Sequence, residues 1–391
     1  MAKRTAVSTS ERAAGRFIVG FDGTAMTPDL EELLRMGVAG VILFRRNVVD
    51  PRQVAELNAA IVRATRGRPV FISVDQEGGP VQRLRAPFTE FPPHGVLGKI
   101  DDPALTTKVA ATMARELRAL GFNTDYAPVA DVNTNPTNPV IGIRSFSADP
   151  ARVAVHVKAW IKGMQDQGVM ACAKHFPGHG DTSVDSHHDL PSVPHPIARM
   201  REVELVPFRA AVAARVGSVM TAHVVFQALD ADRPATLSKK VLGGLLRTKM
   251  GYKGLIISDD LEMKAIADRV GVPAAAVQSL AAGADLLLIC KTRSLVLESI
   301  DAVAKALERG PVKASAPDAE RRIMVAVKRF LIGTGKKGDG LHRPVDPAKV
   351  MKVVGSAKNG KVATEVARRG EKAGIAWAPP TPAASSPVST T

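Results

Sequence analysis

The sequence predicts a closed (β/α)8 barrel, and three observations lead to this fold class. Short apolar runs alternate along the chain with segments of helical periodicity, which is the pattern of β/α units. Several runs are apolar almost throughout, as expected for parallel strands covered on both faces. Eight such units over roughly 300 residues match the size of a closed barrel. An open doubly wound sheet is the alternative, but no GxGxxG motif follows the first run.

The expected strands are distributed evenly along the chain. They span residues 16–23, 38–44, 69–76, 122–131, 168–176, 217–224, 254–260 and 285–290. The segments between them are amphipathic, among them PRQVAELNAAIVRATR and PALTTKVAATMARELRAL, and are expected to form helices. We therefore assign residues 1–335 to a single barrel domain.

Residues 336–391 differ in composition and are assigned to a basic C-terminal extension. The segment GTGKKGDGLHRP is typical of a Gly-rich linker, and PAKVMKVVGSAKNGKVATEVARRGEKAG is expected to form one or two short helices. The end, IAWAPPTPAASSPVSTT, is rich in Pro, Ser, Thr and Ala, a composition typical of disorder. No chemistry is assigned to the extension.

The overall composition is that of an ordinary globular protein, with 45% apolar and 23% charged residues. Cys172 and Cys290 lie in apolar runs, which indicates buried thiols in a reducing compartment. No secretory signal and no apolar run of roughly 20 residues is present, so we expect a cytoplasmic protein without a membrane span. The net charge is +15, but the basic residues form no stripe interleaved with aromatic residues, so nucleic acid is not the expected partner.

Polar residues recur where the expected strands end. They are Asp22, Asn47, Asp75, Asp131, Lys174, His175, His223, Asp259 and Asp260. One or two of the aspartates could cap the following helix, but capping does not account for the whole set. The C-terminal ends of barrel strands form the face on which active sites are built. The sequence therefore predicts a site on this face.

The segment 174–190, KHFPGHGDTSVDSHHDL, is rich in histidine and aspartate. His175 and His179 are four residues apart, a spacing that suits zinc only on a helix, and the intervening Pro and Gly oppose a helix. A phosphate-binding loop is not indicated, because no GK[ST] sequence follows the glycines. Asp185 stands two residues before His187, so its carboxylate can reach the imidazole and tune a group with an ordinary pKa of about 6.5. An acid/base pair and a solvated loop both remain open.

Two further pairs of polar residues each have more than one possible role. Asp259 and Asp260 end a strongly apolar run, and they could bind a metal, cap the next helix or divide the roles of nucleophile and cap. Asp75 and Arg83 could hold sugar hydroxyls through directional hydrogen bonds, or they could form a structural ion pair.

These segments together resemble glycoside hydrolase family 3, in particular the single-domain bacterial β-N-acetylglucosaminidases of cell-wall recycling. The matching segments are, in family order, GVILFRRN, VDQEGGPVQRLR, FPP, DYAPVADVN, IGIRSFSADP, KHFPGHGDTSVDSHHDLP, MTAHV and GLIISDDLEM. The string KHFPGHGDTSVDSH is highly specific, because neither a barrel nor general sugar binding requires it. The resemblance covers residues 16–290 but not the extension, and the chain departs from the family pattern at Arg45 and Pro80.

The resemblance implies a role for each matched residue. Asp259 would be the catalytic nucleophile, His187 the acid/base and Asp185 its partner. The subsite for N-acetylglucosamine would be formed by Asp75, Arg83, Arg144, Lys174 and His175, with His223 and Asp131 lining the same mouth.

The resemblance also implies a retaining hydrolysis through a covalent glycosyl–Asp259 intermediate. The expected substrate is a terminal β-linked N-acetylglucosamine on a muropeptide derived from peptidoglycan, with an anhydro-muramoyl aglycone. A monomer without cofactor or metal is expected. Phosphorolysis is the alternative, because a neutral imidazole does not repel an anionic acceptor as an ionised Glu would. A metal-dependent hydrolase is a further alternative.

Overall fold

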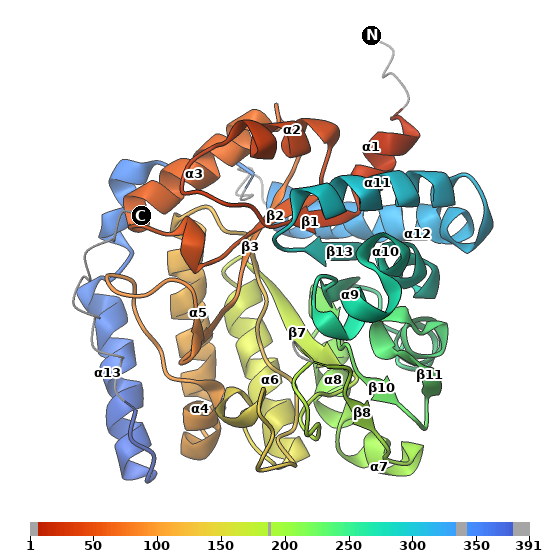
Figure 1. Cartoon of the computed structure of the whole chain (residues 1–391). Helices are drawn as coiled ribbons and strands as arrows, with labels where there is room; N and C mark the ends of the chain where they lie inside the picture. The colour runs from red at the N-terminus through yellow and green to blue at the C-terminus, as the bar shows by residue number, and fades with distance from the viewer. Residues whose placement is uncertain (1–6, 187–188, 334–341, 378–391) are drawn as a thin grey trace, which may run out of the picture.

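The computed structural model of the chain describes residues 7–186, 189–333 and 342–377. Eight parallel strands close into a barrel in the order β1-β13-β12-β9-β7-β6-β3-β2 (Figure 1). The strands are β1 (Phe17–Val19), β2 (Gly40–Leu43), β3 (Phe71–Val74), β6 (Thr124–Asp125), β7 (Met170–Phe176), β9 (Ser218–Thr221), β12 (Leu255–Asp260) and β13 (Leu286–Ile289). Each lies within one of the eight expected runs, so the predicted fold class is confirmed.

Helices cover the outside of the barrel (Figure 1). The main ones are α2 (Pro28–Met36), α3 (Pro51–Ala64), α5 (Pro103–Ala119), α6 (Pro150–Gln165), α8 (Leu205–Ala213), α10 (Val272–Ala282), α11 (Arg293–Leu307) and α12 (Gly310–Ala326). The other helices of the barrel domain are α1 (Thr9–Ala14), η1 (Arg45–Asn47), α4 (His94–Ile100), η2 (Gly142–Arg144), α7 (Ile197–Glu202), η3 (Ala235–Leu237), η4 (Lys240–Lys249), α9 (Lys264–Val270) and η5 (Val327–Ile332). Two small sheets lie outside the barrel, formed by β4 (Gln76–Gly78) with β5 (Val81–Gln82) and by β8 (Ser192–Val193), β10 (Val225–Phe226) and β11 (Asp230–Pro234).

Four of the outer helices begin with the same local sequence device. Thr27, Asp50, Asp102 and Asp149 are N-caps whose side chains accept hydrogen bonds from backbone N–H groups of the first turn. Each is followed by Pro at the first helical position, where a missing N–H leaves no bond unmade. The start of α2, α3, α5 and α6 is therefore set by neighbouring residues alone.

Apolar side chains fill the barrel interior, and one end of the barrel is closed by the C-terminal part of α12 and by η5. Ala326, Val327, Phe330 and Leu331 pack in the same buried cluster as interior residues of the strands, such as Met170. The thiols of Cys172 and Cys290 are both free and buried, as the apolar runs around them predict.

The C-terminal extension lies against the barrel helices rather than apart from them. Its helices are η6 (Pro347–Lys352), which contacts α3, and α13 (Ala357–Lys372), which lies beside α4 and α5 (Figure 1). Asn359 and the backbone N–H of Gly355 both donate to the buried Glu116 of α5. One or two short helices are expected here; two are found, the six-residue η6 and α13, which at 16 residues is not short. None of the helices in the described part of the chain is long and apolar enough to span a membrane.

Candidate active site

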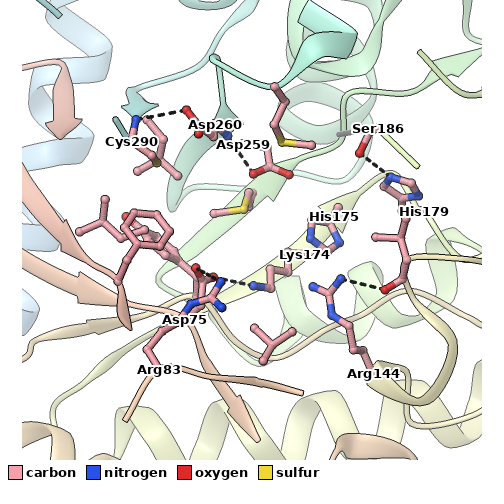
Figure 2. Close-up of a pocket in the computed structure, with 18 residues that line it drawn as sticks. Asp75, Arg83, Arg144, Lys174, His175, His179, Ser186, Asp259, Asp260 and Cys290 are labelled. Carbon is pink, nitrogen blue, oxygen red and sulfur yellow. Dashed lines mark hydrogen bonds and ion pairs between the residues drawn. The ribbon is translucent and has the colours of Figure 1, made fainter. Parts of the chain in front are cut away.

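A pocket of about 210 Å³ opens at the C-terminal ends of the barrel strands (Figure 2). Its ionisable wall residues are Asp75, Arg83, Tyr126, Arg144, Lys174, His175, His179, Asp259, Asp260 and Cys290. Apolar side chains, among them Phe44, Met220 and Met263, complete the wall. The pocket thus lies at the end of the barrel on which the sequence predicts a site.

A buried ion cluster forms one side of the pocket. The two carboxylate oxygens of Glu77 accept hydrogen bonds from Arg144 at 2.8 and 2.9 Å, and the Nζ of Lys174 lies 2.6 Å from Glu77. Lys174 also donates to Asp75 at 2.9 Å. Burial acts to raise the pKa of Glu77, but Arg144 and Lys174 outweigh it and hold this pKa well below its ordinary value. Glu77 is therefore ionised at neutral pH and fixes both cations in place.

Asp75 and Arg83 stand at the edge of this cluster and retain bonding capacity. The nearest approach of their side chains is 3.5 Å, so the close partner of Asp75 is Lys174 and not Arg83. The Nε of Arg83 is buried and has no hydrogen-bond partner among the described residues. A buried donor without a partner is costly unless a ligand accepts from it. The pair therefore offers a carboxylate and a guanidinium to a polar ligand.

Asp131 holds the two histidines of the pocket from behind. Its carboxylate accepts from the backbone N–H groups of His175 and His179 and lies 2.7 Å from the ring Nδ1 of His175. Asp131 is fully buried and does not line the pocket. Its side chain therefore orients His175 and His179 instead of facing the cavity.

His179 connects the end of β7 to the following loop. Its Nδ1 lies 2.8 Å from the hydroxyl of Thr182, and its Nε2 lies 3.1 Å from the hydroxyl of Ser186, which also lines the pocket (Figure 2). Burial lowers the pKa of His179 to about 4, so the ring is neutral at neutral pH. The two hydroxyls thus bind a neutral imidazole, and the contact with Ser186 anchors that residue in the pocket wall.

The glycines of FPGHG allow the loop to turn close to a neighbouring segment. Gly178 has a φ of +137°, and a Cβ on Gly180 would lie 1.8 Å from the carbonyl oxygen of Val132. Any side chain at Gly180 would push the loop away from the segment that follows β6. The bend brings Ser186 back to the pocket.

Asp259 and Asp260 end β12 in different electrostatic environments. Burial acts to raise the pKa of Asp259, but His223, His175 and the backbone N–H of Asp260 outweigh it, and the net shift is downward. Burial raises the pKa of Asp260 to about 7. Two adjacent carboxyl groups with pKa values pushed apart are suited to different roles. Asp259 is the ionised one, and it lies across Lys174 and His175 from Asp75 and Arg83 (Figure 2).

One interpretation of the sequence has Asp260 cap the next helix, but the structure shows that it does not. Its carboxylate accepts from the backbone N–H groups of Glu262 and Cys290, whereas α9 starts after Met263 without a side-chain cap. Asp260 therefore ties the turn after β12 to the end of β13.

Sequence-predicted residues outside the pocket wall have structural contacts. His223 is buried, with ring nitrogens 2.7 Å from the hydroxyl of Thr236 and 2.9 Å from the backbone carbonyl of Asp260, so it supports the end of β12. Asn47 donates to the carbonyls of Phe21 and Gly23. The side chains of His223 and Asn47 thus bond to backbone carbonyls at the ends of strands and in the loops that follow them.

Two other predicted residues, Asp22 and Asp185, do not line the pocket. Asp22 is exposed and forms an ion pair with Arg46. Asp185 is partly buried, next to the anchored Ser186, and does not line the pocket. His187 and His188 lie outside the described residues.

Comparison with known proteins identifies the family. The sequence profile of the glycosyl hydrolase family 3 N terminal domain matches residues 19–329, most of the chain. The chain belongs to glycoside hydrolase family 3. A β-hexosaminidase of Alkalilimnicola ehrlichii is 41% identical over 283 residues, which cover 71% of this chain and 80% of that protein. These similarities make the family 3 protein a glycosidase of the β-N-acetylhexosaminidase type.

Solved structures of family members have the same fold. A β-N-acetylglucosaminidase of Paenibacillus sp. str. FPU-7 is 38% identical, with a TM-score of 0.85 over 93% of this chain and 69% of that one. The NagZ protein of Neisseria gonorrhoeae in complex with N-trifluoroacetyl-D-glucosamine is 29% identical, with a TM-score of 0.73 over 91% and 98% of the two chains. The similarity extends over the full barrel.

Two residues of this family 3 site are absent from the sequence-based set. Glu77 stands two residues after Asp75, and its position just beyond an expected strand was the available signal. His179 was noted in the sequence, but no role could be assigned to it. Glu77 acts through Arg144, 67 residues away, and His179 through Ser186, seven residues further along the same loop; sequence spacing reveals neither contact. Within the described residues, no cluster of three or more His, Cys, Asp or Glu side chains is arranged to hold a metal ion.

Replacing Glu77 by Gln is expected to lower the free energy of unfolding by about 3–5 kcal/mol and to raise KM, because Arg144 and Lys174 lose their buried counter-charge. Urea unfolding and steady-state kinetics measure the two effects. Asp166→Asn is the matched control, since it breaks an exposed ion pair with Lys162 and should cost no more than about 0.5 kcal/mol. The lowered pKa of Glu77 means that its contribution is lost as the pH falls below the ordinary value of 4.5. An equal loss in both variants would contradict the assigned role.

Asp260 should make the enzyme less stable as the pH rises. Its pKa is raised from an ordinary 3.8 to about 7, so between these values the folded state binds more protons than the unfolded state. The free energy of unfolding should therefore fall with pH in this window by more than about 1.4 kcal/mol relative to Asp260→Asn, which cannot ionise. Urea unfolding at pH 4.5 and 7.5 tests this, and parallel pH dependence of the two proteins would exclude it.

Proposed function

We propose that the enzyme releases terminal β-linked N-acetylglucosamine from peptidoglycan-derived muropeptides with retention of configuration. The observation that carries this proposal is the position of Asp259. It is an ionised carboxylate at the end of β12, in the wall of the same pocket as a cluster of fixed charges suited to a polar sugar. One of its oxygens accepts the backbone N–H of Asp260, and no described residue donates to the other.

In the first step, a carboxylate oxygen of Asp259 attacks the anomeric carbon while the bond to the leaving oxygen breaks. His187 donates its proton to that oxygen, and a covalent glycosyl–Asp259 ester remains. In the second step, His187 takes a proton from water, which attacks the anomeric carbon and releases Asp259. Two inversions at the same carbon retain its configuration.

Asp185 is the proposed partner of His187 in both steps. The contact of Ser186 with His179 supports this role, because it fixes the residue between Asp185 and His187 in the pocket wall. A carboxylate beside the imidazole stabilises the imidazolium that forms when His187 takes the proton.

The basic rim of the pocket supports an anionic aglycone. The guanidinium of Arg46 lies 4.6 Å from the centre of the Phe44 ring, and that of Arg83 lies 5.7 Å from it. Phe44 and Arg83 line the pocket, and Arg46, which is paired with Asp22, lies on the Phe44 ring beside this wall. A muropeptide carries carboxylates on its aglycone side, which these guanidinium groups can attract.

A comparison of substrates tests the proposed function. We expect kcat/KM for an N-acetylglucosaminyl-anhydro-muramoyl peptide to exceed that for N,N′-diacetylchitobiose at least about tenfold, or 1.4 kcal/mol of transition-state binding. Equal values would contradict the muropeptide assignment. Proton NMR should detect the β-anomer of the sugar first, and an initial α-anomer would exclude retention. Sugar 1-phosphate as the main product in phosphate buffer would indicate phosphorolysis instead of hydrolysis.

A further inference from the structure

A second cavity of about 340 Å³ lies at the end of the barrel opposite the sugar pocket. Gly217 and Gly254 line it and directly precede β9 and β12, whereas Asp259, at the other end of β12, faces the sugar pocket. The cavity is closed on its other side by the end of α12 and by η5, including Phe330. It is therefore larger than the sugar pocket and separated from it by the packed barrel interior.

The wall of this cavity is cationic. Arg215, Lys253, Arg322 and Arg329 line it, and no acidic residue does. In the described part of the chain, the side chains of Arg215 and Lys253 have no hydrogen-bond or ion-pair partner, and Arg329 donates only to the backbone carbonyl of Arg215. These three side chains are exposed, and no described carboxylate binds them, so their positive charge is balanced only by solvent and its ions.

The carboxylate of Asp285 binds the wall residue Arg322 and is already shared. Arg322 donates to one of its oxygens at 2.8 Å, and Arg247 and the backbone N–H of Ile256 bind the other. Asp285 is fully buried outside the cavity wall. It neutralises at most one of the two guanidinium groups and none of the other three cations.

Apolar rings form the inner surface beside these charges. Tyr252 and Phe330 are 3% and 4% exposed, and the guanidinium of Arg329 lies 4.6 Å over the ring of Phe330. Little of either ring is open to the cavity, so Val212, Val216 and Val325 complete its apolar side, and several N–H donors lie on the other. A small inorganic anion would occupy only part of such a volume.

We propose that this cavity binds an organic anion, with a phosphate or carboxylate group held by Arg215, Lys253 and Arg329 and an apolar body held against Tyr252 and Phe330. Guanidinium groups bind both kinds of anion through paired hydrogen bonds. The site is independent of the glycosidase reaction, because none of its residues lies in the sugar pocket.

Isothermal titration of the full-length protein with phenyl phosphate and with benzoate tests the proposal at low ionic strength. N-acetylglucosamine is kept at saturation, so that the sugar pocket is occupied. We expect one binding site, at least tenfold weaker affinity for phenol and for inorganic phosphate, and glycosidase activity that does not change. Saturable binding of either organic anion supports the proposal and identifies the preferred anionic group.

Two variants locate the binding. Lys253→Glu changes an exposed side chain without a partner and should weaken binding at least tenfold, as should Arg329→Gln. Lys158→Glu, on the exposed side of α6, makes the same change in net charge and should alter the affinity less than twofold. Thermal unfolding verifies that each variant is folded. Absence of saturable binding, phenol bound as tightly as the anions, or equal weakening by Lys253→Glu and Lys158→Glu would overturn the proposal.

Discussion

Replacing Asp259 by Asn is expected to reduce kcat by about 10⁴-fold or more, the scale seen when a covalent nucleophile is removed. Asn has the same shape and can still accept the backbone N–H of Asp260, so the end of β12 should keep its conformation. What is lost is the negative charge that attacks the anomeric carbon. The lowered pKa of Asp259 means that this charge is fully present at neutral pH in the native enzyme.

Asp260→Asn is the matched control for Asp259, because it changes the adjacent carboxyl group in the same pocket wall. Since Asp260 bonds to the backbone of Glu262 and Cys290, its replacement should lower kcat less than tenfold. Incubation with a 2- or 5-fluoro N-acetylglucosaminide, followed by intact-mass measurement and peptide mapping, should place a glycosyl adduct on Asp259. A label on Asp260 or any other acid would refute the nucleophile assignment.

Replacing His187 by Ala should have the second largest effect, about 10²–10⁴-fold in kcat/KM for substrates with poor leaving groups. Such substrates need a proton on the departing oxygen, whereas aryl glycosides with acidic phenols leave without one. The loss should therefore diminish as the pKa of the leaving phenol falls. A series of aryl β-N-acetylglucosaminides measures this dependence.

The adjacent His188 provides the control for this series. His188→Ala should remain within about threefold of the native enzyme, because no role in proton transfer is assigned to it. In His187→Ala, the second step should limit turnover of activated substrates, and added azide should accelerate it by attacking the glycosyl–Asp259 ester directly. An equal loss for every leaving group, or a loss in His188→Ala as large as in His187→Ala, would refute the acid/base assignment.

Much of the fold was predictable because its signals are local. Parallel barrel strands are buried on both faces, so each appears as an apolar run, and the caps of α2, α3, α5 and α6 are set by adjacent Thr or Asp and Pro. The predicted position of the site follows from the same runs, since polar residues such as Asp75, Lys174 and Asp259 stand where strands end.

Which of those polar residues face the pocket and which support loops was not predictable. Asp22, Asn47 and Asp131 follow strands just as Asp259 does, but only Asp259 has its carboxylate in the pocket wall. A residue at a strand end can turn toward the cavity, a loop backbone or solvent. Its local sequence is nearly the same in each case, because the choice depends on partners supplied by other strands.

The sequence by itself determined the eight-unit barrel and the face that carries the site, and it placed Lys174 and His175 on that face. Only the tertiary structure decided which charges pair. It placed Glu77 between Arg144 and Lys174, and it set Asp131 behind His175 and His179. It also gave His179 a contact with Ser186. The physical reason is that strand periodicity acts over a few residues, whereas ionisation and hydrogen bonding in a pocket depend on burial and on partners that only the folded chain brings together. These partners are seven residues apart for His179 and Ser186 and 67 apart for Glu77 and Arg144.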